Sequence, residues 1–139
     1  MKPEKRFGLA LIGVVVVILL AGCWYGISRY RQSVRCREAR NAFLVQVEQM
    51  TRNANSQLAA GKSRDDVTRF FAANGIPMRI EAMGDHQEAT GTLRVPAPKG
   101  CASAACVSGA GQIRVMVELD AQGTVMAPGF VFATGANCM

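Results

Sequence analysis

The sequence predicts an α+β protein, in which an N-terminal membrane helix or signal precedes two helices packed on a four-stranded antiparallel meander. Three observations lead to this prediction. The segment 7–28 carries no charged residue and is rich in Val, Leu and Ile. Apolar residues then recur every three or four positions as far as residue 58, which is the helical period. After Pro77 the apolar period changes to two, which is typical of strands with one buried face.

Residues 1–27 are expected to form a membrane anchor or a lipoprotein signal. The apolar run Phe7–Ile27 has the length of about 20 residues that a helix needs to cross the hydrocarbon core of a bilayer. Trp24 and Tyr25, near its end, fit an aromatic belt at the membrane surface. In this interpretation the segment is not cleaved, and one long helix continues as far as Gln49.

The alternative is a cleaved signal, because a short basic start precedes an apolar stretch of signal length. The tetrapeptide Leu20-Ala21-Gly22-Cys23 resembles the bacterial lipobox. The resemblance implies that Cys23 carries a diacylglycerol and becomes the new N-terminus once residues 1–22 are removed. Both interpretations remain open at this point.

The net charge of +6 is confined to the region around the apolar run. Residues 1–40 contain eight basic and two acidic residues, whereas residues 41–139 contain eight of each. Basic residues that flank an apolar segment pair with lipid phosphates, so the lipid bilayer is an expected partner. The body has no basic stretch with interleaved aromatic residues, so nucleic acid is not expected as a partner.

Four cysteines besides Cys23 predict two disulfides and an oxidising compartment. Three pairings are possible. The least demanding one joins Cys101 to Cys106 across a short loop and leaves Cys36 to pair with Cys138. The cysteines therefore place the body in the periplasm, although the five arginines that follow the apolar run favour the cytoplasm by charge bias alone.

Two helices are predicted after the anchor. The first lies within the basic, amphipathic segment 28–60. The second begins at Ser63, a favourable N-cap residue with Asp66 at the capping-box position, and ends at Asn74-Gly75. The small α+β domain of residues 61–139 shares its core with residues 39–60. The apolar stripe of the first helix consists of Ala39, Phe43, Val47, Met50, Ala54 and Leu58.

Four strands are predicted after Pro77. The clearest is Ile113–Leu119, in which apolar and polar residues alternate, and Asp120–Gly123 after it has the composition of a hairpin turn. Two shorter alternating segments precede this strand and are joined by residues 84–88. These segments are Met78–Glu81 and Thr92–Val95.

The last strand, residues 125–133, is interrupted at Pro128-Gly129 and is therefore expected at an edge or at a bulge. The long connection 96–112 holds two cysteines, and loops of this length are usually functional. This loop and the edge strand are the two surfaces at which a protein partner is expected, because an exposed edge accepts a further strand.

The segment Gly61-Lys62-Ser63-Arg64-Asp65-Asp66-Val67 resembles the start of the second helix in the SmpA/OmlA lipoproteins of the outer-membrane assembly machinery and in beta-lactamase inhibitor protein. The order of the predicted elements over residues 39–133 is also similar to the small helix–helix–sheet domain of these families. The resemblance implies the same arrangement of two helices on one sheet.

The sequence predicts no catalytic residue, no cofactor and no metal site. His86 is the only histidine, no Cys-x-x-Cys motif is present, and most carboxylates lie at helix caps, turns or strand faces. The predicted function is that of a non-enzymatic binding or assembly accessory in a bacterial cell envelope, held at the cell membrane by one span or by lipid.

Two alternatives to this function remain. In the first, the chain is a small single-pass subunit of an inner-membrane complex, bound through an uncleaved helix by Val14–Val17 and Trp24. In the second, it is a cysteine-dependent enzyme that uses Cys101 or Cys106 with His86.

Overall fold

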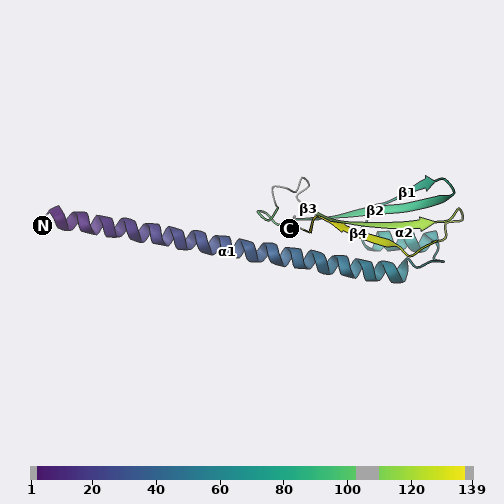
Figure 1. The fold of residues 1–139 in the computed structure, drawn as a ribbon, viewed down its shortest axis with the longest axis horizontal. Helices are drawn as coiled ribbons and strands as arrows, with labels where there is room; N and C mark the ends of the chain where they lie inside the picture. Colours follow the sequence, from purple (N-terminus) through teal and green to yellow (C-terminus); the bar gives the residue numbers. More distant parts are fainter. Residues whose placement is uncertain (1–2, 103–109, 137–139) are drawn as a thin grey trace. The chain divides into compact units, whose positions relative to one another are not determined.

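The structure is a computed structural model that describes residues 3–102 and 110–136, with side chains from residue 12 onward (Figure 1). It confirms the predicted fold class. The chain divides into two units, Met1–Arg35 and Cys36–Met139. The elements are α1 (Pro3–Gln57), α2 (Arg64–Ala73), β1 (Met78–Met83), β2 (His86–Pro96), β3 (Ala110–Leu119) and β4 (Phe130–Thr134).

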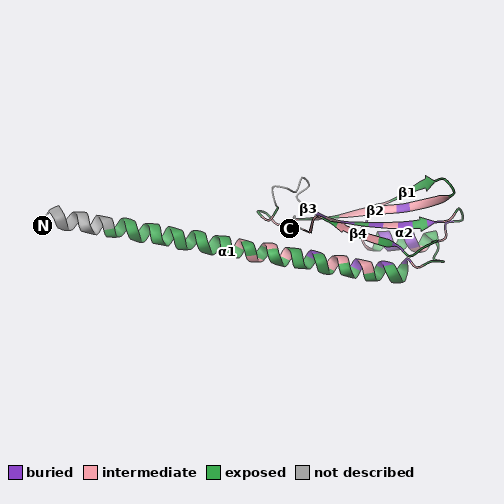
Figure 2. Cartoon of the chain, in the orientation of Figure 1, coloured by how far each residue is buried: buried purple, intermediate pink, exposed green. Residues whose placement is uncertain are grey.

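The first unit consists of helix α1 as far as Arg35. Every residue from 12 to 31 is exposed (Figure 2). The large apolar side chains are among them, and Trp24 is 79% exposed. The described helix from Ile12 to Gln57 is long and apolar enough to cross a membrane, with a mean hydropathy of 1.9 in its most apolar part. The helix runs through Cys23 without a break, as the uncleaved interpretation predicts.

In the second unit, α1 and α2 cover one face of the sheet and enclose the core. The part of α1 from Cys36 to Gln57 rises about 32 Å, which matches the length of about 33 Å that β2 spans. The helix therefore runs along the whole sheet. The predicted stripe is largely confirmed, because Phe43, Met50, Ala54 and Leu58 are buried and Val47 packs against them.

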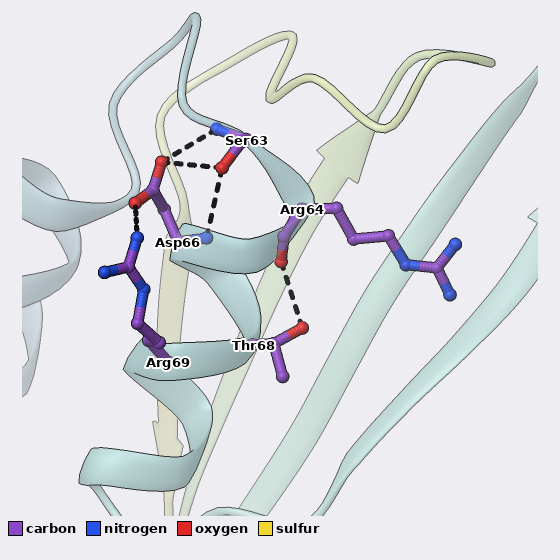
Figure 3. Close-up of polar contacts among 5 residues, drawn as sticks. All are labelled: Ser63, Arg64, Asp66, Thr68 and Arg69. Carbon is purple, nitrogen blue, oxygen red and sulfur yellow. Dashed lines mark hydrogen bonds and ion pairs between the residues drawn. The ribbon is translucent and has the colours of Figure 1, made fainter.

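Helix α2 begins with the predicted capping box (Figure 3). The Ser63 backbone N–H donates to Asp66 Oδ2 at 3.0 Å, and Ser63 Oγ accepts from the Asp66 backbone N–H at 3.3 Å. The Ser63 hydroxyl also donates to Asp66 Oδ2 at 2.8 Å. These hydrogen bonds from Ser63, with Arg69 nearby, hold the pKa of Asp66 below its ordinary value. The cap thus fixes the helix start, and α2 buries Val67, Phe70 and Phe71.

The four strands form one antiparallel sheet in the order β1-β2-β3-β4, which is the predicted meander. Its inner face packs on the helices through alternate residues of β3. Gly91 lies on this face beneath α2, where an added Cβ would be 2.7 Å from Phe71 Cε1 and 2.5 Å from Ile76 Cγ2. The absence of a side chain therefore allows the close approach. The buried residues of β3 that alternate in this way are Ile113, Val115, Val117 and Leu119.

The first hairpin is tighter than predicted. The sequence predicts a connection over residues 84–88, but β1 and β2 meet in a turn of only Gly84 and Asp85, with Met83 paired to His86. Gly84 has a φ of 70°, which a two-residue hairpin of the II′ kind requires at its first position. Residues 86–88 are polar but still belong to β2. The sequence does not predict them as strand because they lack the alternation of apolar and polar residues that marks a strand with one buried face.

The last strand is shorter than predicted. The structure begins β4 at Phe130, whereas residues 125–129 lie outside it, and Val125 forms only an isolated bridge with Leu119. The cause lies in Gly129, whose backbone N–H donates to the carbonyl oxygen of Leu58 at 3.0 Å instead of to a strand. The edge position of this strand is confirmed, and so is the turn before it, where Gly123 has a φ of 83°.

The preferred disulfide pairing is wrong. Cys36 is bonded to Cys101, with their Cα atoms 5.3 Å apart. The pairings Cys101–Cys106 and Cys36–Cys138 are therefore both excluded. The reason is the length match between α1 and the sheet, because it brings Cys36 beside the chain that leaves the end of β2. Cys106 and Cys138 lie outside the described residues.

Candidate functional site

The structure separates the residues of the predicted thiol site. Cys101 is in a disulfide, so it has no thiol with which to act as a nucleophile. His86 begins β2 and therefore lies about 33 Å along the strand from Pro96, near which the disulfide is attached. Cys106 lies outside the described residues, so its pairing with His86 stays a hypothesis.

His86 instead belongs to the first hairpin. Its Nδ1 lies 3.0 Å from Asp85 Oδ1. This hydrogen bond raises the pKa of His86, with smaller contributions from the charges of Asp85, Glu118 and Glu88. The same contact lowers the pKa of Asp85. The contact between the turn residue Asp85 and the first residue of β2 therefore orients the imidazole.

The remaining predicted site features are Cys23 and the loop 96–112. Cys23 is an exposed free cysteine within α1. The loop 96–112 is described only in part, because residues 103–109 lie outside the described structure. Within the described part of the chain, no group of three His, Cys, Asp or Glu side chains is arranged to hold a metal ion.

The most distinctive surface is the face of the sheet that points away from the helices, which we call the outer face. It carries the residues of β2 and β3 that alternate with the core, together with their partners on β1 and β4. Apart from Ala110 at the start of β3, no side chain of these strands on the outer face is buried. No described helix covers this face, because α1 and α2 both pack on the opposite side.

Three glutamates form a row across the outer face, which we call the acidic row. The register pairs Glu81 with Glu88 and Glu88 with Glu118. Directly paired residues have Cβ atoms about 5 Å apart, and like charges in this position repel each other. Among the described residues, no Lys, Arg or His nitrogen forms an ion pair with any of the three.

An apolar patch adjoins the acidic row at the β4 edge. It consists of Met116, Phe130 and Phe132, and Met116 is paired with Phe130 in the register. Phe130 and Phe132 are 61% and 50% exposed. Aromatic side chains on the solvated side of an edge strand are unusual, because this side of an antiparallel sheet is normally polar. Contiguous apolar side chains of this kind mark interaction sites.

A cleft of about 350 Å³ lies where the acidic row meets the apolar patch. Glu88 and Glu118 line one side, and Met116 and Phe130 line the other, with the chain before β4 closing the end at Pro128. The cleft therefore combines two carboxylates with apolar walls. Sequence reasoning places Glu118 on a strand face and Glu88 in the connection 84–88, and it lacks the register that aligns them.

The arrangement fits the recognition of a side chain with a positive charge and an apolar stem. Comparison with known proteins adds no functional assignment. No protein family, curated protein or solved structure matches this chain.

Proposed function

We propose that the chain is a membrane-anchored protein of a bacterial cell envelope, with a disulfide-bonded periplasmic body that acts as a non-enzymatic binding or assembly accessory. The observation that carries the proposal is the outer face of the sheet. A small domain that packs its helices on one sheet face and leaves exposed aromatic residues on the other is suited to contact a partner.

The long apolar helix and the disulfide support the location. The exposed segment from Ile12 to Ile27 is suited to a bilayer rather than to water. The Cys36–Cys101 disulfide favours an oxidising compartment such as the periplasm. The lipobox-like Cys23 leaves lipid attachment as a second mode of anchoring.

Intact mass of the membrane-extracted chain tests the location. We expect a mass that accounts for disulfide-bonded cysteines, and the same spectrum reports whether residues 1–22 are absent and whether acyl chains are attached. A chain recovered with Cys36 and Cys101 fully reduced under thiol-blocking conditions would contradict the periplasmic placement.

Site-specific photo-crosslinking in cells tests the binding role. A benzoylphenylalanine at Phe132 probes the edge of the outer face, and one at Leu44 probes an exposed position on α1. We expect a discrete crosslinked product from position 132 and none from position 44. Equal crosslinking at both positions, or none at position 132, would contradict a partner on this face.

The alternative role as a small subunit of an inner-membrane complex has its own support. Trp24 is 79% exposed on a helix that is unbroken from Pro3 to Gln57, so the anchor itself offers a packing surface. Exchange of residues 1–27 for an unrelated membrane span distinguishes the two roles. Crosslinking at position 132 survives the exchange if the body recruits the partner and is lost if the anchor does.

A further inference from the structure

We propose that the cleft between the acidic row and the apolar patch binds a lysine or arginine side chain from an exposed, apolar segment of a partner protein. This inference rests on the proposed function, because it names the chemistry of the partner that the outer face contacts. The residues that carry it are Glu88, Glu118, Met116 and Phe130.

The first step in the argument is electrostatic. Glu88 stands between Glu81 and Glu118 in the register, so it has a like charge on both sides. Such pairs destabilise a sheet. The nearest arginine by register is Arg79, one row away, and it forms no ion pair with these glutamates. A cation between Glu88 and Glu118 would relieve this repulsion.

The second step is the shape and polarity of the cleft. Lysine and arginine have an apolar stem that packs on hydrophobic surface while the charged head stays polar. Met116 and Phe130 provide such a surface beside the carboxylates. The face of an exposed aromatic ring also attracts a cation directly. A small metal cation would gain nothing from these apolar walls.

The third step excludes other occupants. Anionic lipid headgroups are repelled by the acidic row. A second copy whose α1 is parallel to that of the first is related to it by a two-fold axis along the strands. Rotation about this axis does not move a residue along the strand direction. The acidic row of one copy would therefore face the acidic row of the other. On the outer face, Arg94 and Arg114 lie toward the other end of the strands, and Arg79 lies one row from the acidic row rather than at its level. Charge complementarity therefore favours a basic segment of a different protein.

The test uses the full, oxidised chain in uncharged maltoside micelles, with ¹³C-labelled methionine methyl groups. The Met116 methyl reports on the cleft, and the Met50 methyl, which lies on the buried side of α1, reports on the integrity of the core. The probe is the peptide acetyl-Val-Arg-Val-Arg-Val-amide. Its matched control carries citrulline at both arginine positions, which keeps the shape and removes the charge.

We expect the arginine peptide to shift the Met116 signal in a saturable, salt-sensitive manner and to leave the Met50 signal in place. The citrulline peptide should bind about tenfold more weakly, since each partly exposed ion pair contributes a few-fold in affinity. The double substitution E88Q/E118Q should weaken the arginine peptide by a similar factor. The matched control E48Q removes an exposed glutamate paired with Arg52 on α1 and should leave binding unchanged.

Four outcomes would overturn the inference. The first is a citrulline peptide that binds as tightly as the arginine peptide, and the second is an unchanged affinity for the arginine peptide in E88Q/E118Q. The third is a loss of affinity in E48Q as large as that in E88Q/E118Q. The fourth is a Met116 signal that shifts with protein concentration in the absence of peptide, which would identify a second copy as the occupant. Crosslinking at position 132 separates this inference from the proposed function. If crosslinking persists but the peptide does not bind, the inference about a cationic side chain is wrong and the proposed binding role stands. If the peptide binds but crosslinking is absent, the proposed binding role in cells is wrong and the cation-binding cleft stands.

Discussion

Cys36 and Cys101 are joined across a sequence separation of 65 residues, and their bond connects α1 to the chain that leaves β2. The bond sits at the end of the sheet opposite the acidic row. The other end of the helix is held by backbone hydrogen bonds, in which the Gly129 N–H donates to the Leu58 carbonyl oxygen and the Gly61 N–H donates to the Val125 carbonyl oxygen. The helix is therefore attached to the sheet at both ends, by a covalent link at one and by backbone contacts at the other.

Removal of this disulfide should destabilise the body strongly. Closing a loop of this length restricts the unfolded chain by about 4 kcal/mol in the chain-entropy model, so we expect C101S to lower the free energy of unfolding by about 2–4 kcal/mol. Chemical denaturation of the purified chain measures the loss. C23S is the matched control, since Cys23 is free and exposed. Equal stability of the two variants would contradict the observed pairing.

The imidazole of His86 should titrate above its ordinary pKa of 6.5, because Asp85 accepts its hydrogen bond. Its contribution to stability is complete below pH 6.5 and is lost as the pH rises through the raised pKa. D85N should move the pKa back toward the ordinary value. NMR titration of the single histidine measures both values, and a wild-type pKa at or below that of D85N would refute the contact.

The capping box should stabilise α2 by an amount typical of N-caps. S63A removes the acceptor for the Asp66 N–H and should cost about 1 kcal/mol. T68A is the control, because the Thr68 hydroxyl donates to the Arg64 carbonyl oxygen within the helix and caps nothing. Thermal unfolding measures both variants. A loss in T68A as large as that in S63A would contradict the role of the cap (Figure 3).

Acid should remove the contribution of the same cap. The pKa of Asp66 is lowered by its hydrogen bonds from Ser63, so the carboxylate stabilises the fold above the ordinary value of 3.8. This stability is lost as the pH falls through the lowered pKa. In S63A the pKa of Asp66 should rise toward 3.8. Carboxyl NMR titration checks the direction, and an unchanged pKa in S63A would contradict the assignment.

Gly91 should tolerate no larger residue. In G91A the new Cβ would lie 2.5 Å from Ile76 Cγ2 and 2.8 Å from the Pro77 carbonyl oxygen, so the core must shift. Overpacking of this kind costs about 1–3 kcal/mol. T90A changes the adjacent position on the outer face and serves as the control. Denaturation curves that coincide for the two variants would show that the inner face has room at Gly91.

Local patterns were sufficient to predict the elements of the fold. The apolar stripe from Phe43 to Leu58 has the helical period. The capping box is formed by Ser63 and Asp66, which are three positions apart. Neither pattern depends on distant parts of the chain. The alternation of Ile113–Leu119 likewise predicts a strand with one buried face. These features arise from contacts between near neighbours or from burial on one side.

The disulfide and the acidic row were not predictable in the same way. The partner of Cys101 depends on how far α1 runs along the sheet, which no local pattern reveals. The alignment of Glu81 with Glu88 depends on the two-residue turn at Gly84-Asp85. A longer turn shifts the register and separates the two charges. Both features are therefore set by distances between elements rather than by the elements themselves.

The position of the disulfide also has a mechanical consequence. Cys36 is the first residue of the folded unit, so tension transmitted along α1 from Arg35 reaches this residue before any other part of the body. Part of the load then passes through the sulfur atoms into the chain beside β2. The helix cannot peel from the sheet at the end where tension arrives. Under load, separation must begin at the far end, where only hydrogen bonds and apolar contacts resist it.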